Sequence, residues 1–162
     1  MSRARWRGTK IAAVPPITRS IATPVAWLVW VVTFTIVVLT ILSVQAVGDW
    51  PLPSVYGLGH GFLVVGSTEL VTLVYATVGA LLIQRRLDSR IGWLVAGIGL
   101  GWAIQGYAVW YTAADLLGVV HHPGADFAAW VASWSWLPGQ VGIAAVLPLF
   151  FPDGRLPSRR WG

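Results

Sequence analysis

The chain of 162 residues has no cysteine, and only 10% of its residues are charged. The missing cysteines exclude disulfides, thiolate metal sites and cysteine nucleophiles. Walker-type phosphate loops, nucleophilic serine elbows and H-E-x-x-H zinc motifs are also missing from the sequence, so we expect no catalytic residues and no cofactor. What is present is hydrophobic: 56% of the side chains are apolar and the mean hydropathy is +0.70, which is typical of an integral membrane protein.

Four apolar segments are long enough to cross a bilayer as helices. They cover residues 24–47, 61–83, 91–112 and 127–151. Their many β-branched residues do not predict strands, because an isolated strand would leave its backbone unpaired in lipid. The sequence therefore predicts an all-α membrane protein with four transmembrane helices in a domain of residues 24–151, a basic arm at 1–23 and a linker at 152–162.

All eleven lysines and arginines precede the first segment, join the second to the third, or follow the fourth. The positive-inside rule then places both termini in the cytoplasm of a bacterial cell, with the protein multi-pass in its plasma membrane. The net charge of +5 is thus a topology signal, and we expect no nucleic-acid partner. Pro15, Pro16 and Pro24 are expected to prevent a continuous helix from running out of the basic arm into the membrane.

Eleven tryptophans are present, and most lie where the segment ends predict an interfacial aromatic belt. Those expected at the inner interface are Trp27, Trp30, Trp93 and Trp161, and those at the outer interface are Trp50, Trp110 and Trp130. Trp102, Trp134 and Trp136 lie deeper and are candidates to line a pocket. Bulky packing between helices or towards lipid is the alternative.

Glu69 is the one ionisable residue inside a predicted segment, roughly 12 Å from the outer end of its helix. Charge at that depth is costly, so we expect Glu69 to be protonated or paired and treat it as a candidate functional site. Gln105 lies at matching depth on the next helix, which predicts an interhelical hydrogen bond with Glu69; Tyr107 and Thr72 are alternative partners. The competing interpretation is a polar contact that only holds two helices together.

Two further segments carry helix-shaping residues. Gly97 and Gly101 form a G-x-x-x-G pattern, which indicates close helix packing, either within one chain or between two copies. The fourth segment contains Pro138, followed by Gly139 and the intramembrane polar residue Gln140, and then Pro148. Each proline is expected to kink the helix, as a moving part or as a static feature.

The predicted outer loops contain all three histidines and several carboxylates. The weak candidates for a metal site or for sensing of external pH are His60, His121, His122, Asp115 and Asp126. Adjacent histidines do not easily share one tetrahedral site, so solvated loop residues are the alternative interpretation.

Two stretches resemble the N-terminal, multi-spanning membrane region of actinobacterial sensor histidine kinases. One is Gln84 to Leu94, a basic turn leading into Ile-Gly-Trp-Leu, with Ser89-Arg90 where the family has Asn-Pro. The other is the Phe-Pro-Asp-Gly-Arg-Leu-Pro-Ser stretch of residues 151–158, in which Pro152, Asp153, Gly154 and Arg155 form the predicted cytoplasmic linker. The resemblance covers roughly residues 80–161.

The resemblance implies a sensory or signal-relaying module of a two-component system. In that family, further helices lead to a dimerising helix with a phospho-accepting histidine and to an ATP-binding domain. No kinase residue can be carried over to this chain, so we expect a longer parent protein, with a stand-alone relative as the alternative. The expected partners are the lipid bilayer and a second copy or a larger membrane protein; a response regulator would act only through the kinase core. The alternative functions are an accessory subunit of a membrane complex and, resting on Glu69, a small transporter.

Overall fold

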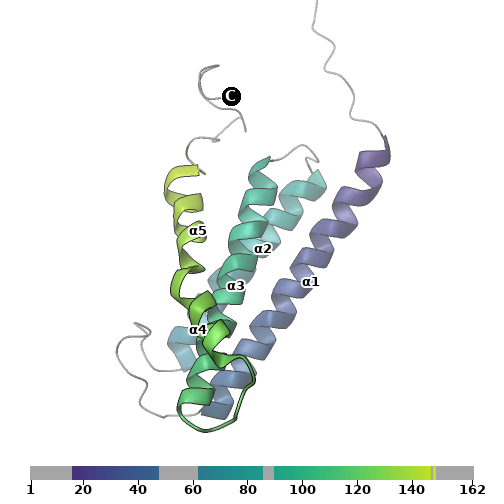
Figure 1. Cartoon of the computed structure of the whole chain (residues 1–162). Helices are drawn as coiled ribbons and strands as arrows, with labels where there is room; N and C mark the ends of the chain where they lie inside the picture. The colour runs from purple at the N-terminus through teal and green to yellow at the C-terminus, as the bar shows by residue number, and fades with distance from the viewer. Residues whose placement is uncertain (1–15, 48–61, 86–89, 147, 149–162) are drawn as a thin grey trace, which may run out of the picture.

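The computed structural model describes residues 16–47, 62–85, 90–146 and 148, and every regular element within these ranges is helical. The elements are α1 (Pro16–Val47), α2 (Phe62–Arg85), α3 (Arg90–Leu116), α4 (Ala125–Trp134), α5 (Trp136–Val141) and a π-helical turn (Gly142–Val146). Successive long helices are antiparallel, so that the start of α1, the end of α2 and the start of α3 lie at one end (Figure 1). Residues 1–15 of the basic arm and the linker at 152–162 lie outside the described residues.

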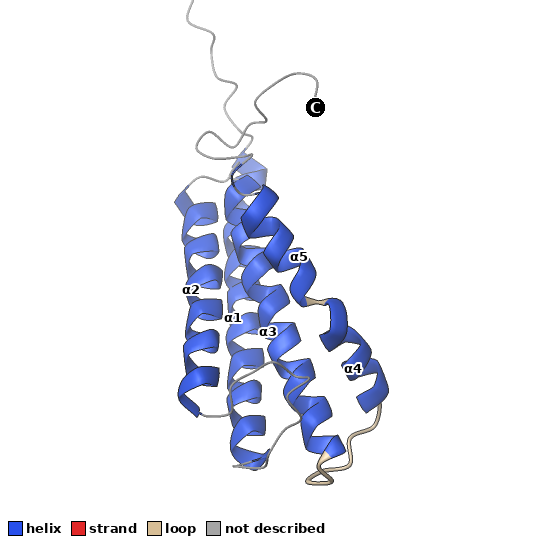
Figure 2. Cartoon of the chain, turned by 90° about the vertical axis from the view of Figure 1, so that its left-hand side faces the viewer, coloured by secondary structure: helices blue, strands red, loops and turns tan. Residues whose placement is uncertain are grey.

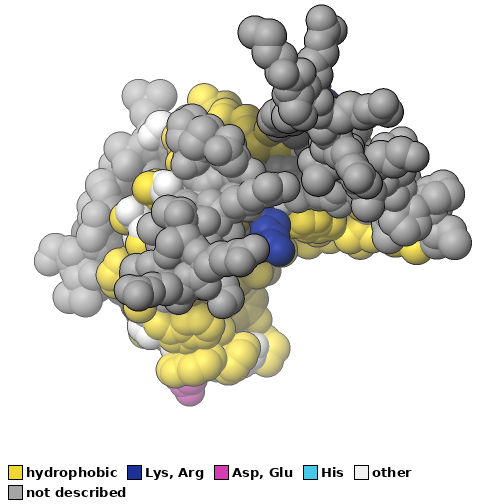
Figure 3. All heavy atoms as spheres, turned by 90° about the horizontal axis from the view of Figure 1, so that it is seen from above, with side chains coloured by type: hydrophobic (Ala, Val, Ile, Leu, Met, Phe, Trp, Pro, Cys, Tyr) yellow, Lys and Arg dark blue, Asp and Glu magenta, His cyan; other side chains and the backbone are white. Residues whose placement is uncertain are grey.

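Three helices are long and apolar enough to cross a membrane: Ile21–Val47, Val65–Arg85 and Arg90–Leu116. Many large hydrophobic side chains of the described helices are exposed, and hydrophobic side chains are visible where the grey residues leave the bundle uncovered in Figure 3. Exposure of this kind is unfavourable in water and favourable in lipid. The helical, multi-pass membrane character predicted from the sequence is therefore confirmed.

Helix α3 lies at the centre and packs against α1, α2 and the α4–α5 run. Glycines bring α2 and α3 together: a Cβ atom added at Gly79 would lie 2.5 Å from the backbone nitrogen of Ala96, and one at Gly99 would lie 2.8 Å from that of Ala76. These glycines permit backbone contact that any larger residue would prevent.

The G-x-x-x-G pair does not make this contact. A Cβ atom added at Gly97 or Gly101 would meet nothing within 4 Å. The expectation of tight packing within the chain at these two residues was wrong, because the face of α3 that meets α2 carries Gly92, Gly99 and Gly106 instead. Those three residues are spaced seven apart, which keeps them on one side of the helix.

Helix α1 runs without interruption from Pro16 to Val47, with Pro24 inside it. The predicted helix break at Pro24 was therefore wrong. Proline fixes φ at a helical value, so its cost is one lost hydrogen bond and a clash with the preceding turn, both of which a transmembrane helix can tolerate. Pro16 begins the helix, where a missing N–H is harmless.

The predicted fourth helix is present in pieces. Helices α4 and α5 are separated at Ser135, and Figure 2 shows the break as a short non-helical step. Pro138 has no N–H to donate to the carbonyl of Trp134, the last residue of α4, which accounts for the interruption. The π-helical turn follows directly and precedes Pro148, which likewise cannot donate to the preceding turn.

Candidate functional site

A cavity of about 450 Å³ with a mixed polar and apolar lining lies over α3, between α2 and α5. It brings together the three intramembrane polar residues that the sequence singled out, Glu69 from α2, Gln105 from α3 and Gln140 from α5. The other lining residues are Val65, Ser67, Thr68, Val71, Thr72, Trp102, Gly106, Val109, Trp110 and Trp136. The described part of this lining contains no lysine, arginine or histidine.

Glu69 is 5% exposed, and its Oε2 atom has no hydrogen-bond partner. Its Oε1 atom lies against Gly106, where an added Cβ atom would be 2.6 Å from that oxygen and 3.8 Å from the Thr40 methyl group of α1. The glycine therefore makes the space that the carboxyl group occupies. Glu69 shares a face of α2 with Thr72, Ala76 and Gly79, the stripe that meets α3.

The predicted Glu69–Gln105 hydrogen bond is not formed between these two described residues. Neither alternative partner replaces it: the Thr72 hydroxyl donates to the Thr68 carbonyl at 3.1 Å, and the Tyr107 ring packs against Tyr111. Glu69 and Gln105, which the sequence places at matching depth, line the same cavity. Neighbouring residues of an α-helix point in directions about 100° apart. The residue of α3 that faces Glu69 is Gly106, so its neighbour Gln105 points in another direction around the helix axis.

Tryptophans form the apolar part of the cavity lining. Trp102 lies edge-on to Tyr75 of α2, with ring centroids 5.3 Å apart, and its indole also contacts Gly139 of α5 closely enough that a Cβ atom there would overlap it. Trp102 thus touches both helices that flank the cavity. Trp136 lines the cavity as well, whereas Trp134 packs edge-on against Trp130.

Trp110 differs from its predicted place in the outer aromatic belt. It is buried in a cluster with Val44, Val47 and Val65, where α1, α2 and α3 meet. Small neighbours on its own helix, Ala113 and Ala114, leave room for the indole inside the bundle. The position of a tryptophan near a helix end therefore did not decide whether it faces lipid or protein.

A second, apolar groove of about 440 Å³ lies on another side of α3, against α1 and α4. Ile36, Ile104, Tyr107, Tyr111 and Phe127 contribute to its walls. Sequence reasoning missed this groove, because its residues are ordinary apolar ones that carry no separate signal.

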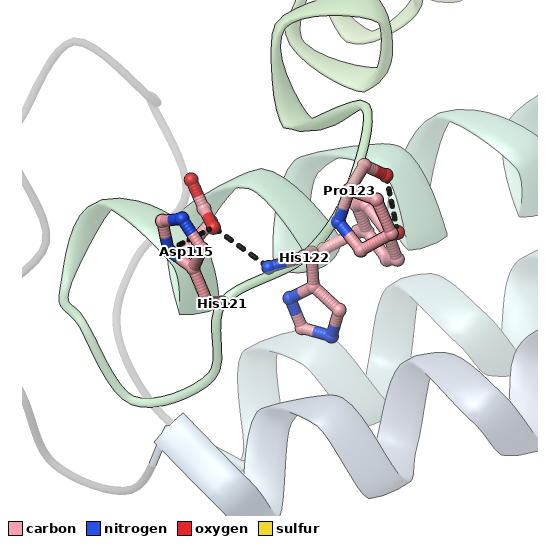
Figure 4. Close-up of polar contacts among 5 residues, drawn as sticks. Asp115, His121, His122 and Pro123 are labelled. Atoms are coloured by element: carbon pink, nitrogen blue, oxygen red, sulfur yellow. Dashed lines mark hydrogen bonds and ion pairs between the residues drawn. The ribbon is translucent and has the colours of Figure 1, made fainter.

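The loop between α3 and α4 gathers four of the five metal-site candidates, namely Asp115, His121, His122 and Asp126, around a shallow depression. As Figure 4 shows, one Asp115 oxygen, Oδ1, accepts the backbone N–H of His122 at 2.8 Å and lies 3.4 Å from Nδ1 of His121. His121 is almost fully exposed, and the His122 ring packs on Tyr111. The hydrogen bond from the His122 N–H joins the loop to Asp115 in the last turn of α3.

Within the described ranges, no group of three or more histidine, aspartate or glutamate side chains is arranged to hold a metal ion. His60, and the linker residues Pro152, Asp153, Gly154 and Arg155, lie outside the described residues. No protein-family model, curated protein or solved structure matches the chain.

Proposed function

We propose that the chain is a four-span sensory and signal-relay module in the bacterial plasma membrane, with both termini in the cytoplasm, that serves a two-component histidine kinase whose catalytic core lies outside this chain. One observation carries the proposal: the cavity at Glu69 has continuous helices on one side and a broken helix on the other. A molecule bound in this cavity would displace α5 more easily than α2 or α3, because α5 belongs to the broken helix.

The contacts around Trp102 supply a route for the relay. Trp102 lines the cavity and its indole lies against Gly139 of α5, so a change in the ring position would be transmitted to α5. From α5 the chain continues towards the Pro152–Arg155 stretch, which resembles the linker of the kinase family. Helix shifts on the order of 1–2 Å are sufficient for signalling when the packing has two stable arrangements.

The four-span topology is supported by the direction and length of the last segment. The run from Ala125 to Val146 starts at the end of the bundle where α3 finishes and returns towards the end where α3 begins (Figure 1). As a straight α-helix its twenty-two residues would extend roughly 33 Å at about 1.5 Å each, so the interrupted run reaches at most about the thickness of the hydrocarbon core. An even number of spans agrees with basic residues at both chain ends.

The test measures the position of α5 by spin-label distances. Because the chain has no cysteine, label pairs can be introduced without background. A pair at the exposed positions Leu81 of α2 and Val141 of α5 reports on the relay, and a pair at Leu28 of α1 and Leu81 is the control. In nanodiscs, we expect Glu69→Gln to shift the first distance by about 2 Å and leave the control pair unchanged.

Pro138→Ala restores the missing N–H and should join α4 to α5, which would suppress that shift. An α2–α5 distance that is identical in the wild type and in Glu69→Gln would overturn the relay. A shift of equal size in the control pair would also overturn it, since the whole bundle would then have rearranged.

An accessory subunit of a larger membrane complex is the second candidate. Helix α4 buries none of its residues and exposes Phe127, Trp130 and Trp134, a surface suited to another membrane protein. Gentle purification from the native membrane distinguishes the two candidates. A stoichiometric partner that is lost on Phe127→Ala and Trp130→Ala would favour the accessory subunit.

A further inference from the structure

We propose that the Glu69 cavity binds a small hydrophobic organic cation, such as a quaternary ammonium compound, with the Glu69 carboxylate as its counter-charge and tryptophan rings as its walls. This inference rests on the proposed sensory function, because it names the class of ligand that the sensor would detect. Three features of the cavity carry it: an unpaired acid, aromatic walls and an opening between helices.

The unpaired acid defines the charge of the ligand. Oε2 of Glu69 is buried without a hydrogen-bond partner, and the described lining of the cavity contains no basic side chain to balance a carboxylate. A buried carboxylate without a partner is strongly unfavourable, so the unliganded Glu69 holds a proton. A cation that enters as this proton leaves to the solvent supplies the missing counter-charge, and its own apolar substituents keep the cost of desolvating it low. An anionic ligand finds no basic side chain in the described lining.

The aromatic walls select a cation with apolar substituents. Trp102, Trp110 and Trp136 line the cavity, and the face of an indole attracts ammonium groups more strongly than other aromatic rings do. Tyr75 and Gly139 hold Trp102 on its two sides, so this wall is formed before a ligand arrives. The side-chain amides of Gln105 and Gln140 also line the cavity, and their carbonyl oxygens carry partial negative charge that favours a cation.

The size and placement of the cavity fit a ligand that arrives through the bilayer. A volume of about 450 Å³ is far more than a bound proton or water molecule needs and lies in the range of small-molecule sites. Helices α2 and α5 both pack chiefly against other elements and leave the cavity between them. A lipophilic cation concentrates in the membrane and can enter from that side.

Direct binding measurements test the proposal. The probe is tritiated benzyltrimethylammonium, added to the whole chain in phosphatidylcholine nanodiscs, with neopentylbenzene as the uncharged molecule of the same shape. We expect saturable binding of the cation that neopentylbenzene does not displace. Glu69→Gln should weaken binding at least tenfold, whereas Asp126→Asn, which removes one carboxylate outside the cavity, should leave the affinity unchanged.

A second variant keeps the test decisive if Glu69→Gln does not fold. Trp102→Phe retains an aromatic ring but a weaker cation-binding face, so we expect affinity to fall severalfold. Absence of saturable binding to the wild type would overturn the proposal, as would equal binding to Glu69→Gln. Equal competition by neopentylbenzene would do so too, because the site would then recognise shape without charge.

The two proposals fail separately. The spin-label distances in Glu69→Gln are measured without any ligand and therefore test the relay alone. Cation binding with an immobile α5 would support the site and contradict the sensory function. Movement of α5 without cation binding would support the relay and assign the stimulus to another chemical class.

Discussion

The two parts of the bundle are held together differently. Helices α1, α2 and α3 are continuous and close-packed, with small residues in backbone contact and twelve residues of α3 buried. The α4–α5 run is broken at Ser135, packs chiefly on α3, and buries no residue of α4 and only Gly139 of α5. Both parts are rich in glycine and apolar residues, so composition does not explain the contrast.

The position of proline and glycine relative to the neighbouring helices explains it. Pro24 lies inside a continuous helix, whereas Pro138 lies next to a break. Where glycines face another backbone, as at Gly79 and Gly99, the helices meet directly; Gly139 instead faces the broad ring of Trp102. Cavities lie on both sides of α3, one between α4 and α1 and the other between α5 and α2, because the α4–α5 run does not pack closely against α1 or α2. Segments with few buried contacts open at the lowest free energy.

The largest effect is expected at the contact between α2 and α3. Gly99→Ala should destabilise the protein by about 1–3 kcal/mol, because the new methyl group would meet the backbone of Ala76, which cannot move aside. Gly97→Ala is the matched control on the same helix: it gains the same helix propensity of about 1 kcal/mol and meets nothing. Denaturation in mixed micelles, followed by circular dichroism, compares the two.

Equal stability of both variants would contradict the backbone contact at Gly99. A loss of stability in Gly97→Ala that depends on protein concentration would have a different meaning. It would place the Gly97–Gly101 face at an interface between two copies of the chain.

A smaller effect is expected where the fourth segment meets α3. Gly139→Ala should push α5 away from Trp102 and cost about 1 kcal/mol or less, since this segment has few buried contacts to lose. The Leu81–Val141 label pair should lengthen, whereas Gly142→Ala, whose methyl group would meet only side-chain atoms of Ile98 and Leu94, should change it less. Unaltered distances in Gly139→Ala would mean that α5 does not depend on this contact.

The sequence was sufficient to predict the long helices, but not their rotation about the helix axes. Hydropathy and length identified the three helices that are apolar and long enough to cross a membrane, and Glu69 and Gln105, which were expected at matching depth, line one cavity. The predicted hydrogen bond between them is not formed, because the depth of a residue does not determine the direction in which its side chain points around the helix axis. The same ambiguity explains Gly97: a helix with glycines on several faces does not reveal which one meets a neighbour. The break at Ser135, by contrast, followed from a local cause, the missing N–H of Pro138.

The hydrogen bond between α1 and α2 should contribute a modest amount. Trp30 donates from Nε1 to the Thr77 hydroxyl at 2.8 Å. Thr77→Val keeps the shape and removes the acceptor, so we expect a loss of about 0.6 kcal/mol in the micelle assay. Thr35→Val is the matched control, because the Thr35 hydroxyl is exposed and bonds only to its own helix at Val31. Indistinguishable losses in the two variants would contradict a stabilising role for this bond.

The smallest effect on global stability is expected in the loop that connects the two parts. Asp115→Ala removes the acceptor of the His122 N–H, so that amide should exchange with deuterium about fivefold faster, in keeping with the loss of about 1 kcal/mol for one hydrogen bond. Global stability should stay within about 0.5 kcal/mol of the wild type, because the close-packed helices do not depend on the loop. His121→Ala removes an exposed ring and keeps the Asp115–His122 bond, so its exchange rate should match the wild type. A global loss in Asp115→Ala would mean that this loop, and not the contact of α5 with Trp102, holds the fourth segment to the bundle.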